Sequence, residues 1–303
     1  MTVTKIITHI KPHLDEFAAI WMVKTFGGKI FEGIFDAPVE YWPHRGILPG
    51  GKTAEQLENE GVLLIGIGGG RFDEHASAGT GRKQGDCALT LIAKELGLEN
   101  VPTHKKLLEY VVKNDLKGSG NGFYELASIA TALNDKWGEK DPGRVLDNVM
   151  DILDAKYKQC VEFEKAQVEF GEKARMHPFR AGFPEQPLTM AIIESDNLAL
   201  AKHARQRNVA ILVQKTALGN VQIFIDKKTG LRMENVVGEL RRVEAKMRRL
   251  SLAYEESFKE GNFMYWYYQP AGEMTFNGSK TAVEEPTRIP LEIITATVMQ
   301  FAK

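Results

Sequence analysis

The sequence predicts an α/β protein with a doubly wound, mostly parallel sheet, followed by a second, smaller α/β domain. Strand-like and helix-like segments alternate in the first part of the chain, which favours a parallel sheet with helices on its faces. The apolar run 62–67 has the length and uninterrupted character of a buried parallel strand. At 303 residues the chain exceeds the usual size of one domain. We predict a first domain at 1–150, a helical linker at 151–180 and a second domain at 181–303.

The charge, the cysteine content and the apolar segments of the sequence limit the functional classes to which the protein can belong. The formal net charge of −1 gives no global electrostatic argument for nucleic-acid binding, although a local basic groove stays possible. The two cysteines, Cys87 and Cys160, match no metal-binding spacing and suit a reducing compartment. The first residues lack a signal-peptide pattern, and no apolar run approaches the ~20 residues of a membrane helix. We therefore expect a cytoplasmic protein that does not bind membranes.

The first domain is predicted to contain three strands and several helices. The predicted strands are 4–7, 29–35 and 62–67. A loop rich in Pro and Gly is predicted at 38–52. The predicted helices are 16–25, 53–59, 88–97 and a segment around 107–112. Gly97 stands where a helix commonly stops.

A long helix over 145–176 is predicted to end at His177-Pro178, because proline disfavours the helical conformation of the residue before it. Beyond it we predict a second α/β domain. Its predicted strands are 188–193, 209–213 and 220–225, with an aromatic strand at 263–268. Its predicted helices are 197–207, 234–250 and 291–301.

Two imidazoles and a carboxylate lie where the first strand runs into the first helix. His9, His13 and Asp15 are spaced by four and by two residues, and ligands collect at the carboxyl ends of strands in α/β sheets. This mixture of ligand types suits Mn, Fe, Co or Zn. The alternative is structural: His9 bonds to the backbone, and Asp15 or Glu16 stabilises the helix N-terminus.

A second cluster, Asp73-Glu74-His75, follows the glycines at 68–70, which permit sharp turns. Their spacing is not the dinucleotide-binding fingerprint. The alternative interpretation is a solvated loop before a helix. Asp115 is a third candidate at a predicted helix end, where a capping role is the more common one.

Together these motifs resemble the DHH phosphoesterase superfamily. The match is closest to the Myg-type branch, with Thr8-His9 and His13-Leu14-Asp15-Glu16 as the first motif and Gly70-Arg71-Phe72-Asp73-Glu74-His75 as the later one. The resemblance implies a metal site between an N-terminal doubly wound domain and a smaller C-terminal domain. It covers roughly the first 150 residues.

The sequence departs from this family at two positions. Gly66 stands where the superfamily has an aspartate that bridges two metal ions, and Glu74 stands where it has a histidine ligand. Asp36 is the only nearby substitute, but it belongs to an earlier predicted strand. We expect that an aspartate introduced at position 66 raises Mn occupancy.

The resemblance implies specific roles. The metal ligands would be His9, His13, Asp15, Glu74 and Asp115. His75 would contact the substrate phosphate or transfer a proton, with Asp73 orienting its neighbours. Mn is the expected ion, with Mg, Co, Fe or Zn as alternatives.

Substrate-binding candidates are Arg71 and the segment Asn277-Gly278-Ser279-Lys280, for which an ordinary hairpin turn is the favoured alternative. A basic run at 232–249 usually forms a solvated face, although it would suit a phosphate backbone if it lined a cleft.

The expected function is a metal-dependent phosphoesterase acting on a short oligonucleotide, a nucleotide or a small phosphate ester held between the domains. A catalytically weakened relative that only binds such ligands and a non-enzymatic scaffold are the alternatives. A homodimer is also possible.

Overall fold

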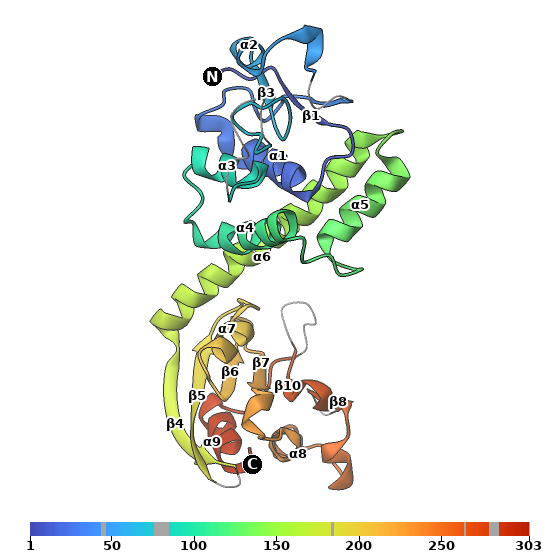
Figure 1. Cartoon of the computed structure of the whole chain (residues 1–303). Helices are drawn as coiled ribbons and strands as arrows, with labels where there is room; N and C mark the ends of the chain where they lie inside the picture. The colour runs from blue at the N-terminus through green and yellow to red at the C-terminus, as the bar shows by residue number, and fades with distance from the viewer. Residues whose placement is uncertain (44–46, 76–84, 183–184, 264, 279–284, 303) are drawn as a thin grey trace. The chain divides into compact units, whose positions relative to one another are not determined.

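The computed structural model describes residues 1–43, 47–75, 85–182, 185–263, 265–278 and 285–302. The chain divides into two compact units, Met1–Val161 and Glu162–Lys303, which we describe separately (Figure 1).

The first unit contains a parallel sheet with the strand order β2-β1-β3 in the described residues. Its strands are β1 (Lys5–His9), β2 (Val39–Trp42) and β3 (Val62–Leu64). Successive side chains of β1 point to opposite faces: Ile6 joins the main core and Ile7 a smaller cluster on the other face. The predicted parallel sheet is therefore confirmed, with three strands.

Helices cover both faces of this sheet. The helices are α1 (Leu14–Phe26), α2 (Ala54–Asn59), α3 (Ala88–Glu95), α4 (Pro102–Lys117), α5 (Leu126–Trp137) and the start of α6 (Pro142–Lys173). Leu57 of α2 packs in the smaller cluster, whereas the other helices surround the main core. Thr53 caps α2 in a capping box with Gln56, as the sequence pattern indicates.

The predicted strand at 29–35 is wrong. The segment instead begins with the short helix η1 (Gly27–Lys29) and continues as turns, and the strand β2 forms inside the predicted loop 38–52. The backbone of this segment bonds within its own turns and to the N-terminal residues, where Glu32 forms an isolated parallel bridge with Thr2. The Nζ of Lys24 in α1 binds the carbonyls of Ile34, Phe35 and Ala37.

The second unit carries the larger sheet. In the described residues it has seven strands in the order β4-β5-β6-β7-β10-β9-β8, of which only the β5–β6 pair is parallel. The strands are β4 (Arg175–Ala181), β5 (Gln186–Glu194), β6 (Ile211–Lys215), β7 (Val221–Ile225), β8 (Gly261–Phe263), β9 (Trp266–Gln269) and β10 (Met274–Phe276). The prediction of a mostly parallel sheet thus does not extend to this unit.

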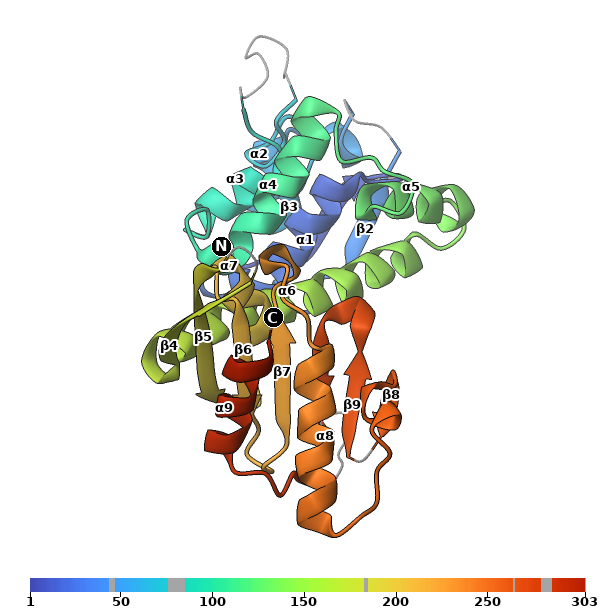
Figure 2. The ribbon, with the colours of Figure 1, turned by 90° about the horizontal axis from the view of Figure 1, so that it is seen from below.

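Helices cover both faces of the second sheet as well. Met190 and Ile192 point toward α8 (Glu234–Arg248) and α9 (Leu291–Phe301), which lie on one face (Figure 2). Ala191 and Ile193 point to the other face, toward α7 (Leu200–Gln206) and the last turns of α6.

The residues 151–180, predicted as a helical linker, form the rest of α6 and most of β4. His177-Pro178 lies inside β4, whereas α6 has already ended at Lys173. Pro178 fits there because β4 is an edge strand, paired only with β5, where a missing N–H is tolerated. Among the described residues, none of the helices has the length and apolar character that a membrane crossing requires.

Candidate metal centre

The first motif occupies the turn after the central strand. His9 is the last residue of β1, and His13 is the N-cap of α1. Lys11 has a left-handed backbone with φ of 53°, which helps the chain reverse within four residues. Asp15 and Glu16 lie in the first turn of α1, and both are buried. The turn therefore brings the two imidazoles together with the carboxylate of Glu16, whereas Asp15, the carboxylate predicted to join them, lies with Cys87 and Asp115.

Helix α5 supports this turn from outside. The Nδ2 of Asn134 donates to the carbonyl oxygen of Pro12 at 2.7 Å. Just beyond the end of α5, Oε1 of Glu139 lies 3.0 Å from the Nζ of Lys11. These contacts hold the loop that carries His9 and His13.

The described residues contain three groups of side chains whose ligand atoms, within each group, all lie within 4.8 Å of one another. Each group unites residue types that bind divalent ions. The groups are His9, His13 and Glu16; Asp15, Cys87 and Asp115; and Asp73, Glu74 and His75. Every metal ligand and catalytic residue predicted from the sequence is a member of one of them.

Carboxylates from the three groups act on one another electrostatically. Burial raises the pKa of Asp15 well above its ordinary value, and the charges of Glu16, Asp115 and Glu74 raise it further. Burial also raises the pKa of Glu74, with a contribution from Glu16 and Asp115. Carboxylates that influence one another in this way lie close together. The site therefore concentrates negative charge that a divalent cation would neutralise.

Both ring nitrogens of His9 face acceptors. Nδ1 lies 2.8 Å from the carbonyl oxygen of Ile10, which can only accept, and Nε2 lies 2.9 Å from Oε1 of Glu16. A protonated imidazole, a protonated Glu16 or a cation held between Nε2 and Oε1 would satisfy both contacts. Burial alone would raise the pKa of Glu16, but the hydrogen bond and charge of His9 lower it to about 2. Glu16 is therefore a carboxylate.

Within the three groups, two buried carboxylate oxygens have no hydrogen-bond partner among the described residues. They are Oδ1 of Asp15 and Oε2 of Glu74, whose side chains are 2% and 1% exposed. The other oxygen of Asp15 accepts from the backbone N–H of Ala88 at 3.2 Å. A buried acceptor without a partner is costly, and a bound cation removes that cost. The residues present thus fit a divalent ion.

The Asp73-Glu74-His75 turn holds an imidazole in a defined orientation. Oδ1 of Asp73 accepts from the backbone N–H of His75 and lies 2.9 Å from its Nδ1, while Oδ2 accepts from the backbone N–H of Gly69. When Nδ1 donates to this carboxylate, Nε2 is the basic nitrogen. The His75 side chain is exposed, so this arrangement suits a group that meets a ligand from solvent.

Gly66 lies two residues beyond the end of β3 and beside Glu16. A Cβ at Gly66 would approach Cγ of Glu16 to 2.5 Å. The expectation that an aspartate at position 66 raises Mn occupancy stays a prediction, but such an aspartate would have to displace the side chain of Glu16, which already occupies that space. Asp36 precedes β2, so it lies near the amino-terminal ends of the parallel strands. It therefore cannot replace the missing aspartate at the carboxyl ends.

Sequence reasoning missed two members of the site. Glu16 was given only a role at the helix N-terminus, and it does form a capping box with His13. Its position directly after Asp15 was the one feature of the sequence that could have marked Glu16 as a member of the site. Cys87, the N-cap of α3, meets Asp15 and Asp115. No local spacing reveals it, because the partners are far apart in sequence. Burial raises the pKa of Cys87 to about 12, with Asp15 contributing.

The described substrate-binding candidates bind partners within their own units. Nη1 of Arg71 lies 3.0 Å from Oε1 of Glu95, and its guanidinium stacks on Phe72. Asn277 is buried in the second unit and donates to the carbonyls of Tyr265 and Glu285. Gly278 follows it with a φ of 75°, which suits the alternative of a turn. Ser279 and Lys280 lie outside the described residues.

The basic run at 232–249 is not a uniformly solvated face. Arg241 is fully buried, where its guanidinium donates to the carbonyls of Trp266 and Gly261. Burial lowers its pKa to about 10. Arg248 pairs with Glu244 at 2.6 Å, and the side chains are 4% and 0% exposed. These two arginines therefore stabilise the fold of the second unit.

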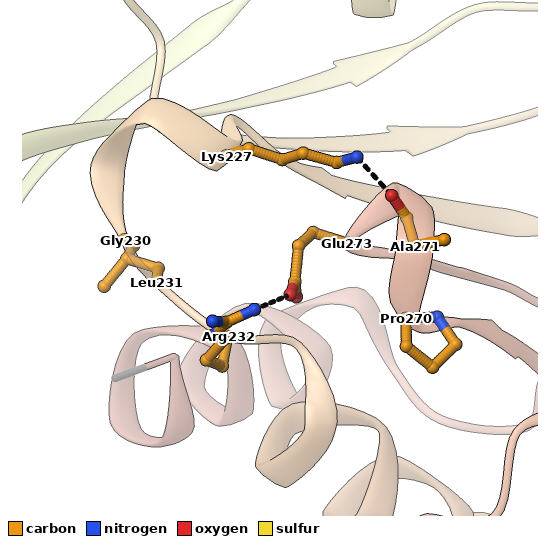
Figure 3. Close-up of a pocket in the computed structure, with 7 residues that line it drawn as sticks. All are labelled: Lys227, Gly230, Leu231, Arg232, Pro270, Ala271 and Glu273. Atoms are coloured by element: carbon orange, nitrogen blue, oxygen red, sulfur yellow. Dashed lines mark hydrogen bonds and ion pairs between the residues drawn. The ribbon is translucent and has the colours of Figure 1, made fainter.

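A cavity of about 250 Å³ in the second unit has a structural explanation (Figure 3). Its buried carboxylate, Glu273, pairs with Arg232 and accepts from the backbone N–H of Met233, the N-cap of α8. Lys227 donates to the carbonyl of Ala271. The polar groups in this hollow thus bind one another and cap a helix.

No protein-family model matches the chain, and no curated protein matches it significantly. Among solved structures, the chain is similar to an uncharacterized protein from Helicobacter pylori G27. The two share 11% sequence identity over 75% of this chain and 86% of that chain, with a TM-score of 0.28. A likeness of this size supports no inference about function, so the candidate function depends on the residues of the site.

Proposed function

We propose that the protein is a metal-dependent phosphoesterase that acts on a short oligonucleotide, a nucleotide or another small phosphate ester. The observation that carries the proposal is the convergence of buried carboxylates, with unpartnered oxygens on Asp15 and Glu74, and imidazoles at one edge of a parallel sheet. The doubly wound, DHH-like architecture is part of this proposal. It is supported by helices on both faces of the first sheet.

A divalent ion bound here would supply a nucleophile from bound water and would neutralise charge on the phosphate. His9, His13, Asp15, Glu74 and Asp115 would hold it. His75, oriented through its Nδ1 by Asp73, presents Nε2 to a phosphate oxygen or to a proton in transit.

A second candidate function is binding of the same ligands without turnover. Gly66 favours it, because the position of the family's bridging carboxylate has no side chain. The two candidates differ in one measurement, the release of product from a bound phosphate ester.

The proposal is tested with bis(4-nitrophenyl) phosphate and 4-nitrophenyl phosphate in the presence of Mn²⁺. We expect hydrolysis of one of these esters. Asp15→Asn should reduce the rate by at least about 100-fold, because mutating a residue that only supports a metal ligand already costs up to about 100-fold. Asp151→Asn, an exposed aspartate of α6, is the matched control and should leave the rate unchanged. Metal and nucleoside monophosphate binding without hydrolysis would favour the second candidate, and a protein that binds no metal would exclude both.

A further inference from the structure

Glu16 occupies the volume that a side chain at Gly66 would need. An ideal Cβ on Gly66 would lie 2.5 Å from Cγ, 2.7 Å from Oε1 and 3.1 Å from Cδ of Glu16. The carboxylate of an aspartate at position 66 would begin one bond beyond that Cβ. The carboxyl group of Glu16 therefore lies where the side chain of an aspartate at position 66 would have to fit.

We propose that Glu16 supplies the metal centre with the carboxylate that Gly66 lacks, using Oε1 as the ligand atom. This inference rests on the proposed function, because it assumes that the site binds a divalent ion. With Glu16 as a ligand, the absence of an aspartate at position 66 does not leave the centre one carboxylate short.

The distance between Glu16 and His9 fits two ligands of one ion. Oε1 lies 2.9 Å from Nε2 of His9. Two atoms bound to an ion at about 2.1 Å, with about 90° between the bonds, lie about 3 Å apart. An ion between these atoms would also satisfy both ring nitrogens of His9, because Nδ1 donates to the carbonyl of Ile10.

The second oxygen of Glu16 fixes the orientation of the first. Oε2 accepts from the backbone N–H of His13 at 2.7 Å, and Glu16 is 1% exposed. The helix cap thus positions Oε1 before any ion binds. A ligand held in advance loses little conformational freedom on binding.

A capping role alone is the competing explanation, and Glu16→Gln separates the two. Glutamine also serves at this position of a capping box, so the variant keeps the cap but loses the negative charge. We expect the Kd for Mn²⁺, measured by titration calorimetry, to rise by about 10-fold or more. The Tm of the metal-free protein should change much less than it does in Glu16→Ala.

An exchange of the carboxylate between the two positions tests their equivalence. Gly66→Asp alone should weaken Mn²⁺ binding, because its Cβ meets Glu16. Glu16→Ala removes that obstacle, so the double variant Glu16→Ala/Gly66→Asp should bind Mn²⁺ more tightly than Glu16→Ala. Aspartate tolerates the left-handed backbone of position 66, where φ is 63°. Gly97→Asp is the matched control, with a φ of 67° and no atom within 4 Å of the added Cβ.

The outcomes separate this inference from the proposed function. If Glu16→Gln binds Mn²⁺ as the unchanged chain does, while Asp15→Asn binds it weakly, the metal centre stands and the role of Glu16 is refuted. A double variant that binds no better than Glu16→Ala also refutes it. If the unchanged chain binds no Mn²⁺ or Zn²⁺, both the inference and the proposed function fail.

Discussion

Asp15 carries an electrostatic cost in the protein without an ion. Burial raises its pKa well above the ordinary value of 3.8, so the folded chain keeps a proton that the unfolded chain releases. The stability that this group contributes is therefore complete below pH 3.8 and is lost as the pH rises toward its folded-state pKa. Glu16 has the opposite effect. Its pKa is lowered from 4.5 to about 2, so its contribution is present above pH 4.5 and is lost as the pH falls toward 2.

Replacing Asp15 by asparagine should remove that cost. In the metal-free protein at pH 7.5 we expect the Tm to rise by about 2–4 °C, which is about 1 kcal/mol for a domain of this size. At pH 4 the difference should shrink. Added Mn²⁺ should raise the Tm of the unchanged chain but not that of Asp15→Asn. Thermal unfolding with and without Mn²⁺ at both pH values measures these effects, with Asp151→Asn as the control. A lower Tm for Asp15→Asn at pH 7.5 would contradict the argument.

At the scale of elements, α5 holds the turn between β1 and α1. The Nδ2 of Asn134 donates to the carbonyl of Pro12, and both residues are buried. Because the turn carries His9 and His13 without regular secondary structure of its own, its conformation depends on this support.

Asn134→Ala should therefore affect both stability and the site. Loss of the donor leaves a buried carbonyl without its partner, which costs about 1–3 kcal/mol in the free energy of unfolding. We also expect weaker Mn²⁺ binding. Urea unfolding and calorimetry test the two effects. Asn148→Ala is the matched control, because Asn148 is exposed and donates to the carbonyl of Arg144 within its own helix. Equal effects of the two substitutions would show that the contact to Pro12 has no special role.

At the scale of the whole molecule, each unit has its own apolar core. The first half of α6 contributes Val145, Val149 and Leu153 to the core of the first unit. Its last turns contribute Ala166 and Phe170 to a cluster of the second unit. All of the proposed metal ligands, from His9 to Asp115, belong to the first unit.

A fragment of residues 1–161 should therefore bind divalent metal with the stoichiometry of the full chain, whereas residues 162–303 should bind none. Elemental analysis after dialysis against Mn²⁺ gives the stoichiometry, and circular dichroism reports whether each fragment is folded. If the first fragment is folded but binds no metal, while the full chain binds it, the second unit contributes a ligand.

Much of the fold was predictable from local pattern. The helices α1, α2, α6, α8 and α9 and the strands β1, β3, β5, β6 and β7 lie close to the predicted ranges, because apolar periodicity and caps are written into neighbouring residues. The predicted strand at 29–35 failed because turns and a single bridge to Thr2 supply the backbone partners there. The mixed pairing of the second sheet depends on which strands meet, which local pattern does not state.

By itself, the sequence determined that His9, His13 and Asp15 lie where the first strand runs into the first helix, since a strand, a turn and a helix start are encoded within a few neighbouring residues. It also marked Asp73, Glu74 and His75 as a second cluster. Only the tertiary structure decided that Glu16 fills the space at Gly66 and that Cys87 meets Asp15 and Asp115. These contacts join residues separated by tens of positions, so they depend on how the strands and helices pack rather than on local spacing.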